Sequence, residues 1–206
     1  MNEAAASGPK HSPGQEAALA RQASLAGAAT AITKCIRPGA TVLIDGRSGS
    51  GKTEFARSLV AALIGSTPVV LVSMDDVYPG WDGLATASES IVETLLLPRR
   101  LNDAGSWRRF DWHTGEIAEQ HRVEASAALI VEGCGSLSRA SHDLADFSVW
   151  LDAPADVRRT RALGRDGAMF EPQWEAWAAQ EEALYAREGS RTLADVIVET
   201  SNVDSA

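Results

Sequence analysis

The chain of 206 residues is poor in lysine and cysteine, and it has no apolar run of membrane-spanning length. Acidic residues outnumber basic ones 28 to 19, so a nucleic-acid partner is not expected. Its two cysteines, Cys35 and Cys134, lack the spacing of metal ligands and favour a reduced, intracellular protein. The N-terminus lacks the basic start and apolar core of a signal peptide. We therefore expect a cytoplasmic protein without a nucleic-acid or membrane partner.

One of the three lysines lies in a glycine-rich stretch, Gly46-Arg47-Ser48-Gly49-Ser50-Gly51-Lys52-Thr53. It matches the pattern G-x-x-x-x-G-K-[ST] and separates an apolar run, 41–44, from a segment with helical apolar spacing, 54–64. Glycines let successive backbone N–H groups converge on phosphate oxygens. The pattern predicts a nucleoside-triphosphate site in which Lys52 reaches the β- and γ-phosphates and the hydroxyl of Thr53 binds Mg²⁺. The nucleotide-binding residues are then Gly46, Ser48, Gly49, Ser50, Gly51, Lys52 and Thr53.

Apolar runs alternate with helical patterns along the chain. The strands are predicted at residues 41–45, 69–74, 127–131, 147–151 and 194–198. The helices are predicted at residues 15–36, 54–64, 88–100, 156–163 and 171–187. Residues 1–14 are expected to be a mobile tail, 101–115 an irregular aromatic flap and 199–206 a loose polar end. The alternation predicts an α/β fold, a three-layer α/β/α sandwich with a parallel sheet, in a single domain over residues 15–206.

Carboxylates follow two of the predicted strands. Asp75 and Asp76 come at the end of strand 69–74, and Glu132 follows strand 127–131. In open parallel sheets, ligands bind at the carboxyl ends of the strands. We therefore expect Glu132 to hold Mg²⁺ directly or through water. The two aspartates are expected to act in the same site, and the sequence leaves open which of them takes part in the chemistry.

These motifs resemble those of the P-loop kinases of the uridine kinase and phosphoribulokinase type. The similarity covers residues from about 36 to 199. It rests on the segments 44–53, 73–78, 110–112, 129–133 and 194–198, and on the arginine run through Arg161 and Arg165. The resemblance implies the P-loop nucleoside triphosphate hydrolase fold. It also implies an enzyme that transfers the γ-phosphate of ATP to a hydroxyl of a small molecule, with Mg²⁺.

The resemblance implies residue roles as well. Asp75 would accept the proton of the attacking hydroxyl, with Asp76 as the alternative. Arg161 and Arg165, in a short lid around residues 161–172, would close over the triphosphate and act in catalysis together with Lys52. The acceptor would be held by Asp76, Tyr78, Asp82, Phe110, Asp111 and Trp112.

The acceptor itself stays open at this stage. Known uridine kinases carry a histidine a few residues after a Tyr-Asp-Phe string, where this chain has Thr114-Gly115 and a shifted His113. We expect a nucleoside first, with a sugar or coenzyme precursor as the alternative. An ATPase or nucleotide-binding protein without an acceptor is a further alternative. A guanine-reading Asn-Lys-x-Asp string does not occur, which argues against a GTPase-like switch. The choice of ATP over another donor, and the oligomeric state, with a homodimer among the options, are also open.

Overall fold

The structure, a computed structural model, describes residues 22–63 and 67–200. Its main sheet is parallel, with the strand order β1-β8-β7-β2-β6-β3. The strands of this sheet are β1 (Gln22–Ala23), β2 (Thr41–Asp45), β3 (Val69–Ser73), β6 (Ala128–Glu132), β7 (Phe147–Asp152) and β8 (Val196–Glu199). A separate antiparallel hairpin is formed by β4 (Gly105–Asp111) and β5 (Glu116–Val123).

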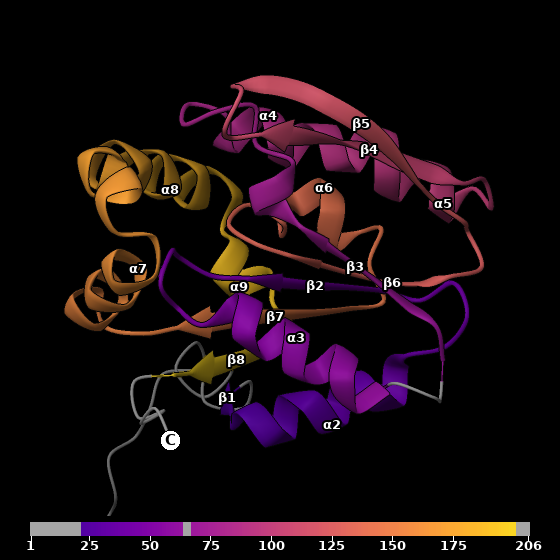
Figure 1. The fold of residues 1–206 in the computed structure, drawn as a ribbon. Helices are drawn as coiled ribbons and strands as arrows, with labels where there is room; N and C mark the ends of the chain where they lie inside the picture. The colour runs from indigo at the N-terminus through magenta and orange to yellow at the C-terminus, as the bar shows by residue number, and fades with distance from the viewer. Residues whose placement is uncertain (1–21, 64–66, 201–206) are drawn as a thin grey trace, which may run out of the picture.

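Helices lie on both faces of the main sheet, as Figure 1 shows, with α2 and α3 on one face and α4, α6 and α8 toward the other. The α-helices are α2 (Leu25–Cys35), α3 (Lys52–Leu63), α4 (Leu84–Ser90), α5 (Leu97–Arg100), α6 (Arg139–His142), α7 (Ala155–Phe170), α8 (Trp174–Glu188) and α9 (Ser190–Leu193). Shorter elements are the 3₁₀-helices η1 (Met74–Asp76) and η3 (Glu171–Gln173) and the π-helix η2 (Ile91–Leu96). The predicted three-layer α/β/α sandwich is confirmed. No helix in the described part of the chain is both long and apolar enough to span a membrane.

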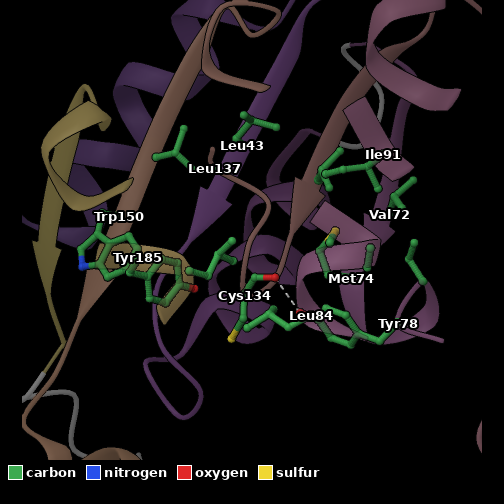
Figure 2. Packing of buried hydrophobic residues seen from close by; sticks show 14 of the residues in the cluster. Leu43, Val72, Met74, Tyr78, Leu84, Ile91, Cys134, Leu137, Trp150 and Tyr185 are labelled. Carbon is green, nitrogen blue, oxygen red and sulfur yellow. Dashed lines mark hydrogen bonds between the residues drawn. The ribbon is translucent and has the colours of Figure 1, made fainter. Parts of the chain in front are cut away.

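Both faces of the sheet are buried, because helices cover each of them. Alternate residues of the central strand point to opposite sides and so enter two different apolar clusters. Ile44 of β2 packs in the apolar cluster under α2 and α3. Its neighbour Leu43 packs in the opposite cluster, with Met74, Leu84 and the other side chains of Figure 2. Both leucine and isoleucine are fully buried. The apolar run 42–44 in the middle of β2 is therefore what this layered fold requires at its centre.

The strand order brings the carboxyl ends of β2, β6 and β3 together. Glu132, at the end of β6, is in register with Ile44 of β2 on one side and Ser73 of β3 on the other. The stretch Gly46–Thr53 follows β2, and Asp75 follows β3. The predicted strand-end residues are thus neighbours in space, although they lie far apart in the sequence.

The five core strands appear within two residues of their predicted ends, whereas the first helix differs from its prediction. Gln22–Ala23 is a short strand that pairs with β8, so the predicted helix over 15–36 is wrong at these residues. The helix begins at Leu25, where the hydroxyl of Ser24 accepts a hydrogen bond from the amide of Gly27 and caps it. Residues 15–21 of that helix and the predicted tail, 1–14, lie outside the described residues.

The helix predicted for 88–100 begins earlier, at Leu84, and passes through η2 before Pro98. Proline lacks a backbone N–H and its ring crowds the preceding turn. The wider π turn, in which the amide of Leu97 bonds to the carbonyl of Val92, relieves this crowding and lets the helix continue to Arg100.

The irregular flap predicted for 101–115 is wrong, because most of it belongs to the β4–β5 hairpin. Residues 105–111 and 116–123 pair antiparallel, and most of β5 is exposed to solvent. A strand without a buried face shows no alternation of apolar and polar residues, so the pattern that predicts strands is absent. The predicted loose end at 199–206 is also wrong at its start, since Glu199 completes β8 and Thr200 is buried.

The last helices also differ in their ends. The helix predicted for 156–163 starts at Ala155 after Pro154 and continues to Phe170, with a break at Gly167 (φ 52°, ψ −132°). The predicted lid around 161–172 therefore corresponds to the second half of α7, this glycine break and η3.

Candidate active site

The glycine-rich stretch Gly46–Thr53 forms a tight loop between β2 and α3, and two of its glycines are required by space. Gly46 has a φ of 147°, and a Cβ there would lie 2.2 Å from the carbonyl oxygen of Leu151. Gly49 has a φ of 79°, and a Cβ there would lie 2.1 Å from the carbonyl oxygen of Arg158. Any larger residue would both strain the backbone and displace its neighbours. The loop sequence is therefore fitted to this position in the fold.

Several backbone amides of this loop make no hydrogen bond within the described part of the chain. The amide of Ser50 donates to the carbonyl of Arg47, and that of Ser48 donates to Glu181. Within the described residues, no hydrogen-bond acceptor is found for the amides of Gly49, Gly51, Lys52 and Thr53. These donors and the N-terminus of α3 suit a phosphate group, because both favour negative charge at the same place.

Lys52 lies beneath the loop, nearly buried, with its ammonium 3.1 Å from the carbonyl oxygen of Arg47 and 3.4 Å from the sulfur of Cys134. Desolvation alone would lower the pKa of Lys52, but nearby acidic groups, among them Glu181 and Glu132, outweigh it and raise that pKa above its usual value. Burial raises the pKa of Cys134 to about 12, so near neutral pH this thiol is uncharged and the carboxylates of Glu181, Glu132 and Asp45 are the anions beside Lys52. The lysine therefore stays a cation beside the open amides.

The two predicted metal ligands are brought together. The hydroxyl of Thr53 lies 3.2 Å from Oε2 of Glu132, and the hydroxyl of Ser73 donates to Oε1 of the same carboxylate at 2.8 Å. Glu132 is 1% exposed, and desolvation raises its pKa despite the nearby charge of Lys52. A hydroxyl and a carboxylate oxygen beside a phosphate position fit a hard cation such as Mg²⁺. No cluster of three or more acidic, histidine or cysteine side chains that could hold a metal alone is found among the described residues.

Asp75 and Asp76 lie in η1, at the end of β3. Asp75 is exposed, and its carboxylate oxygen Oδ2 lies 3.9 Å from Nη2 of Arg165 in α7. Asp76 is half buried, and desolvation together with the neighbouring Asp75 raises its pKa. Asp75 is thus the more accessible carboxylate, and Asp76 is held more firmly within the fold.

The remaining residues predicted to hold the acceptor fall into different environments. Tyr78 is buried, and its hydroxyl donates to the carbonyl of Cys134 at 2.8 Å, as Figure 2 shows. Its hydroxyl is therefore committed to the loop after β6 and is not presented to an open surface. Asp82 is exposed in the segment between η1 and α4. The structure does not bring these two side chains together.

The hairpin end carries the other three predicted acceptor residues. The carboxylate of Asp111 accepts hydrogen bonds from the amides of His113 and Thr114, which lower the pKa of this group, so it shapes the turn. Trp112 packs edge-to-face against Phe110, and its indole donates to the backbone carbonyl of Asp75 at 2.7 Å. Trp112 thereby ties the hairpin to the strand end that carries the candidate base.

Aromatic side chains from four parts of the chain pack together beside Asp75. The ring of Trp81 lies 4.7 Å from that of Trp112, 5.5 Å from the stacked ring of Phe170 and 6.2 Å from that of Trp177. We call these four residues the aromatic wall. It joins the hairpin, the segment before α4, the end of α7 and the start of α8.

The arginines of α7 have separate partners. Arg161 donates to the carbonyl of Thr200 at 2.7 Å, and the hydroxyl of Thr200 in turn donates to the carbonyl of Ser50. Arg161 is thus committed to supporting the loop backbone, and of the two predicted lid arginines it is Arg165 that lies near Asp75. Arg158, which the sequence did not single out, donates to the carbonyl of Ser48 at 3.2 Å.

Two further residues at the loop have no motif in the sequence that marks them. Cys134 follows Glu132-Gly133 and lies between Lys52 and Glu181. Glu181 of α8 is buried. Its helical position predicts that it faces the core, but not which groups it contacts there. Because α8 lies far from the phosphate loop in the sequence, its contact with that loop could not be predicted from spacing.

Comparison with known proteins agrees with this geometry. No family model matches the chain. A curated uridine kinase from Ureaplasma parvum serovar 3 is 25% identical over 179 residues, which cover 76% of this chain and 86% of that protein. A solved structure described as a possible uridine kinase from Bacillus stearothermophilus has a TM-score of 0.61 at 20% identity and covers 84% of this chain and 96% of its own.

A second solved structure, a putative fructose transport system kinase from Silicibacter sp. TM1040, has a TM-score of 0.53 at 17% identity and covers 85% of this chain and 98% of its own. At these identities the solved structures support the fold, and the curated relative supports the resemblance in sequence. Together they confirm that the chain resembles the P-loop kinases of the uridine kinase type.

Proposed function

We propose that the protein is a phosphotransferase that moves the γ-phosphate of ATP to a hydroxyl of a small molecule. The observation that carries the proposal is the convergence of a phosphate loop, the Thr53–Glu132 pair and an accessible Asp75 on one edge of the sheet. A nucleotide-binding protein without an acceptor would need only the loop. The base candidate and the aromatic wall beside it favour transfer to a second substrate.

The residues of the chain divide the work between donor and acceptor. Lys52 and the open amides of the loop would bind and orient the β- and γ-phosphates. Asp75 would take the proton from the acceptor hydroxyl, and Arg165 would supply positive charge to the transferred group. Thr53 and Glu132 would hold Mg²⁺, which when bound neutralises charge on the phosphates. The aromatic wall would limit the access of water to the transferred group.

The acceptor that we propose first is a nucleoside, because the curated relatives are named uridine kinases. A sugar is the second candidate, since one structural relative is described as a putative fructose transport system kinase. A coenzyme precursor is a third candidate. Aromatic side chains beside the base suit either a planar base or the apolar face of a sugar ring. We propose ATP as the donor, and the assay described next tests this order of acceptors.

An assay of ADP release tests the proposal. Purified protein with Mg·ATP is mixed with nucleosides, sugars and vitamin precursors in turn, and the product is identified by mass. We expect ADP release that depends on one acceptor class and yields a phosphorylated acceptor. ADP release that is equally fast without any acceptor would indicate an ATPase, and nucleotide binding without turnover would indicate a binding protein.

A further inference from the structure

One carboxylate oxygen connects the phosphate loop with the aromatic wall. Oε1 of Glu181 accepts hydrogen bonds from the amide of Ser48 at 2.8 Å and from the indole Nε1 of Trp177 at 3.1 Å. It also lies 3.2 Å from the sulfur of Cys134, which can donate to it. All three donors therefore converge on the same atom, and they come from three different parts of the chain.

Burying the carboxylate of Glu181 costs free energy that its surroundings must offset. Glu181 is 1% exposed, and a buried carboxylate is unfavourable unless hydrogen bonds and opposite charge compensate for the lost water. Here the compensation comes from the three donors and from the guanidinium of Arg47, which lies 4.0 Å from Oε2. Breaking such a network leaves buried donors unsatisfied, so the groups around it are held tightly.

The amide donor and the indole donor belong to the two halves of the proposed site. Ser48 belongs to the glycine-rich loop Gly46–Thr53, the proposed donor site. Trp177 packs edge-to-face on Tyr78, with ring centres 4.8 Å apart, and belongs to the aromatic wall through Trp81. A movement of Glu181 would therefore shift the donor loop and the acceptor side together.

The rest of α8 supports the same connection. One helical turn after Glu181, the hydroxyl of Tyr185 donates to Asp45, the residue before the loop, at 2.7 Å. Glu182 forms an ion pair with Arg47 inside the loop. The helix is thus fixed to the loop at successive turns, and Glu181 is the member of this set that also binds the wall.

We propose that Glu181 is a positioning residue that fixes the phosphate loop and the aromatic wall relative to each other. It acts through the amide of Ser48 and the indole of Trp177. The inference rests on the proposed donor site, so nucleotide binding is measured separately from turnover. The proposal predicts that a change at Trp177 alters nucleotide affinity through Glu181.

The test compares variants of Glu181 that keep or remove the acceptor oxygen. Glu181→Gln keeps the oxygen on which the donors converge, whereas Glu181→Leu has a similar size and removes it. Glu175→Leu, at an exposed position of the same helix, is the matched control. We expect Glu181→Leu to raise the Kd for ADP and ATP at least about fivefold, Glu181→Gln to restore it to within about twofold of wild type, and Glu175→Leu to leave it unchanged.

Trp177→Phe supplies a readout that a general loss of packing would not give. It keeps a ring in the wall and removes the indole donor. We expect it to raise the Kd for ADP about twofold or more in the wild-type background and to have no further effect in the Glu181→Leu background. Thermal unfolding and circular dichroism of each variant establish that it is folded, and the Gln and Phe variants suffice if the Leu variant is not.

The outcomes separate the two proposals. If the wild type binds neither ADP nor ATP, the proposed donor site is wrong and this inference is overturned with it. If the wild type binds nucleotide and Trp177→Phe leaves the Kd unchanged, or its effect adds in full to that of Glu181→Leu, the coupling through Glu181 is wrong and the donor site stands.

Discussion

The guanidinium of Arg165 in α7 lies 3.9 Å from the carboxylate of Asp75 at the end of β3 (Nη2 to Oδ2). Both side chains are about half exposed, and ion pairs of this kind contribute roughly 0–1 kcal/mol to stability. The contact lies at the edge of the sheet that carries the phosphate loop, and it joins α7 to the candidate base. Changes at either residue should therefore alter turnover far more than they alter folding.

The first prediction concerns the base. Asp75→Asn should retain ATP binding and lose turnover by about a hundredfold or more, because an amide cannot take the proton of the acceptor hydroxyl. Asp76→Asn is the matched variant, and it should lose less turnover because Asp76 is half buried and more firmly held. Steady-state kinetics of both variants with calorimetric ATP titration check this. The reverse order of losses would assign the base to Asp76.

The second prediction compares two arginines of one helix. Arg165→Gln should lower kcat by about tenfold or more with an unchanged melting temperature, since its positive charge lies near the reacting edge. Arg161→Gln should instead lower the melting temperature, because Arg161 donates to Thr200, which supports the loop at Ser50. Kinetics and thermal unfolding of the pair are the measurements. Equal effects of the two changes on kcat would mean that both arginines act on the phosphates.

Much of this site could be predicted because its residues lie at strand ends. Parallel strands align their carboxyl ends, so Asp75 and Glu132 had to lie near the phosphate loop once their strands were recognised. The hairpin could not be recognised from its apolar pattern, since its second strand is mostly exposed. A turn signal was present, in Thr114 and in Gly115 with its φ of 72°, and it could have located the hairpin.

The partners of individual side chains depend on tertiary packing and could not be predicted from the sequence. Arg161 and Arg165 lie one turn apart on α7, yet the first is committed to Thr200 and the second faces Asp75. Spacing alone treats them alike, because it gives the helix face and not the groups that oppose it. Glu181 illustrates the same limit, since a buried glutamate on a helix has no pattern that distinguishes it from an exposed one.

The third prediction concerns the loop lysine. Lys52→Ala should abolish phosphoryl transfer, by at least about a hundredfold in kcat, because it removes the buried cation beside the open amides. The fold should remain, as judged by circular dichroism. Lys34→Ala, at the exposed end of α2, is the control and should retain full activity. Transfer at a near wild-type rate in Lys52→Ala would show that the donor site lies elsewhere.

The fourth prediction is a pH dependence of stability that originates at Asp45. This carboxyl is fully buried, and desolvation raises its pKa from 3.8 to about 6, although it accepts hydrogen bonds from Leu137, Tyr185, Gly46 and Gly135. A carboxyl with a raised pKa binds its proton more tightly in the folded state than in the unfolded state. Its contribution to stability is therefore present below about pH 4 and is lost as the pH rises toward 6.

The size of this effect follows from the shift in the pKa of Asp45. A difference of about two pKa units corresponds to roughly 3 kcal/mol, at about 1.4 kcal/mol per unit. Asp45→Asn cannot ionise, so subtracting its free energy of unfolding from that of the wild type isolates the carboxyl. Measured by denaturant titration between pH 4 and pH 7, this difference should fall by up to about 3 kcal/mol between pH 4 and pH 6 and then stay level. A difference that rises with pH would mean that the four hydrogen bonds outweigh burial and that the pKa of Asp45 is lowered in the folded protein.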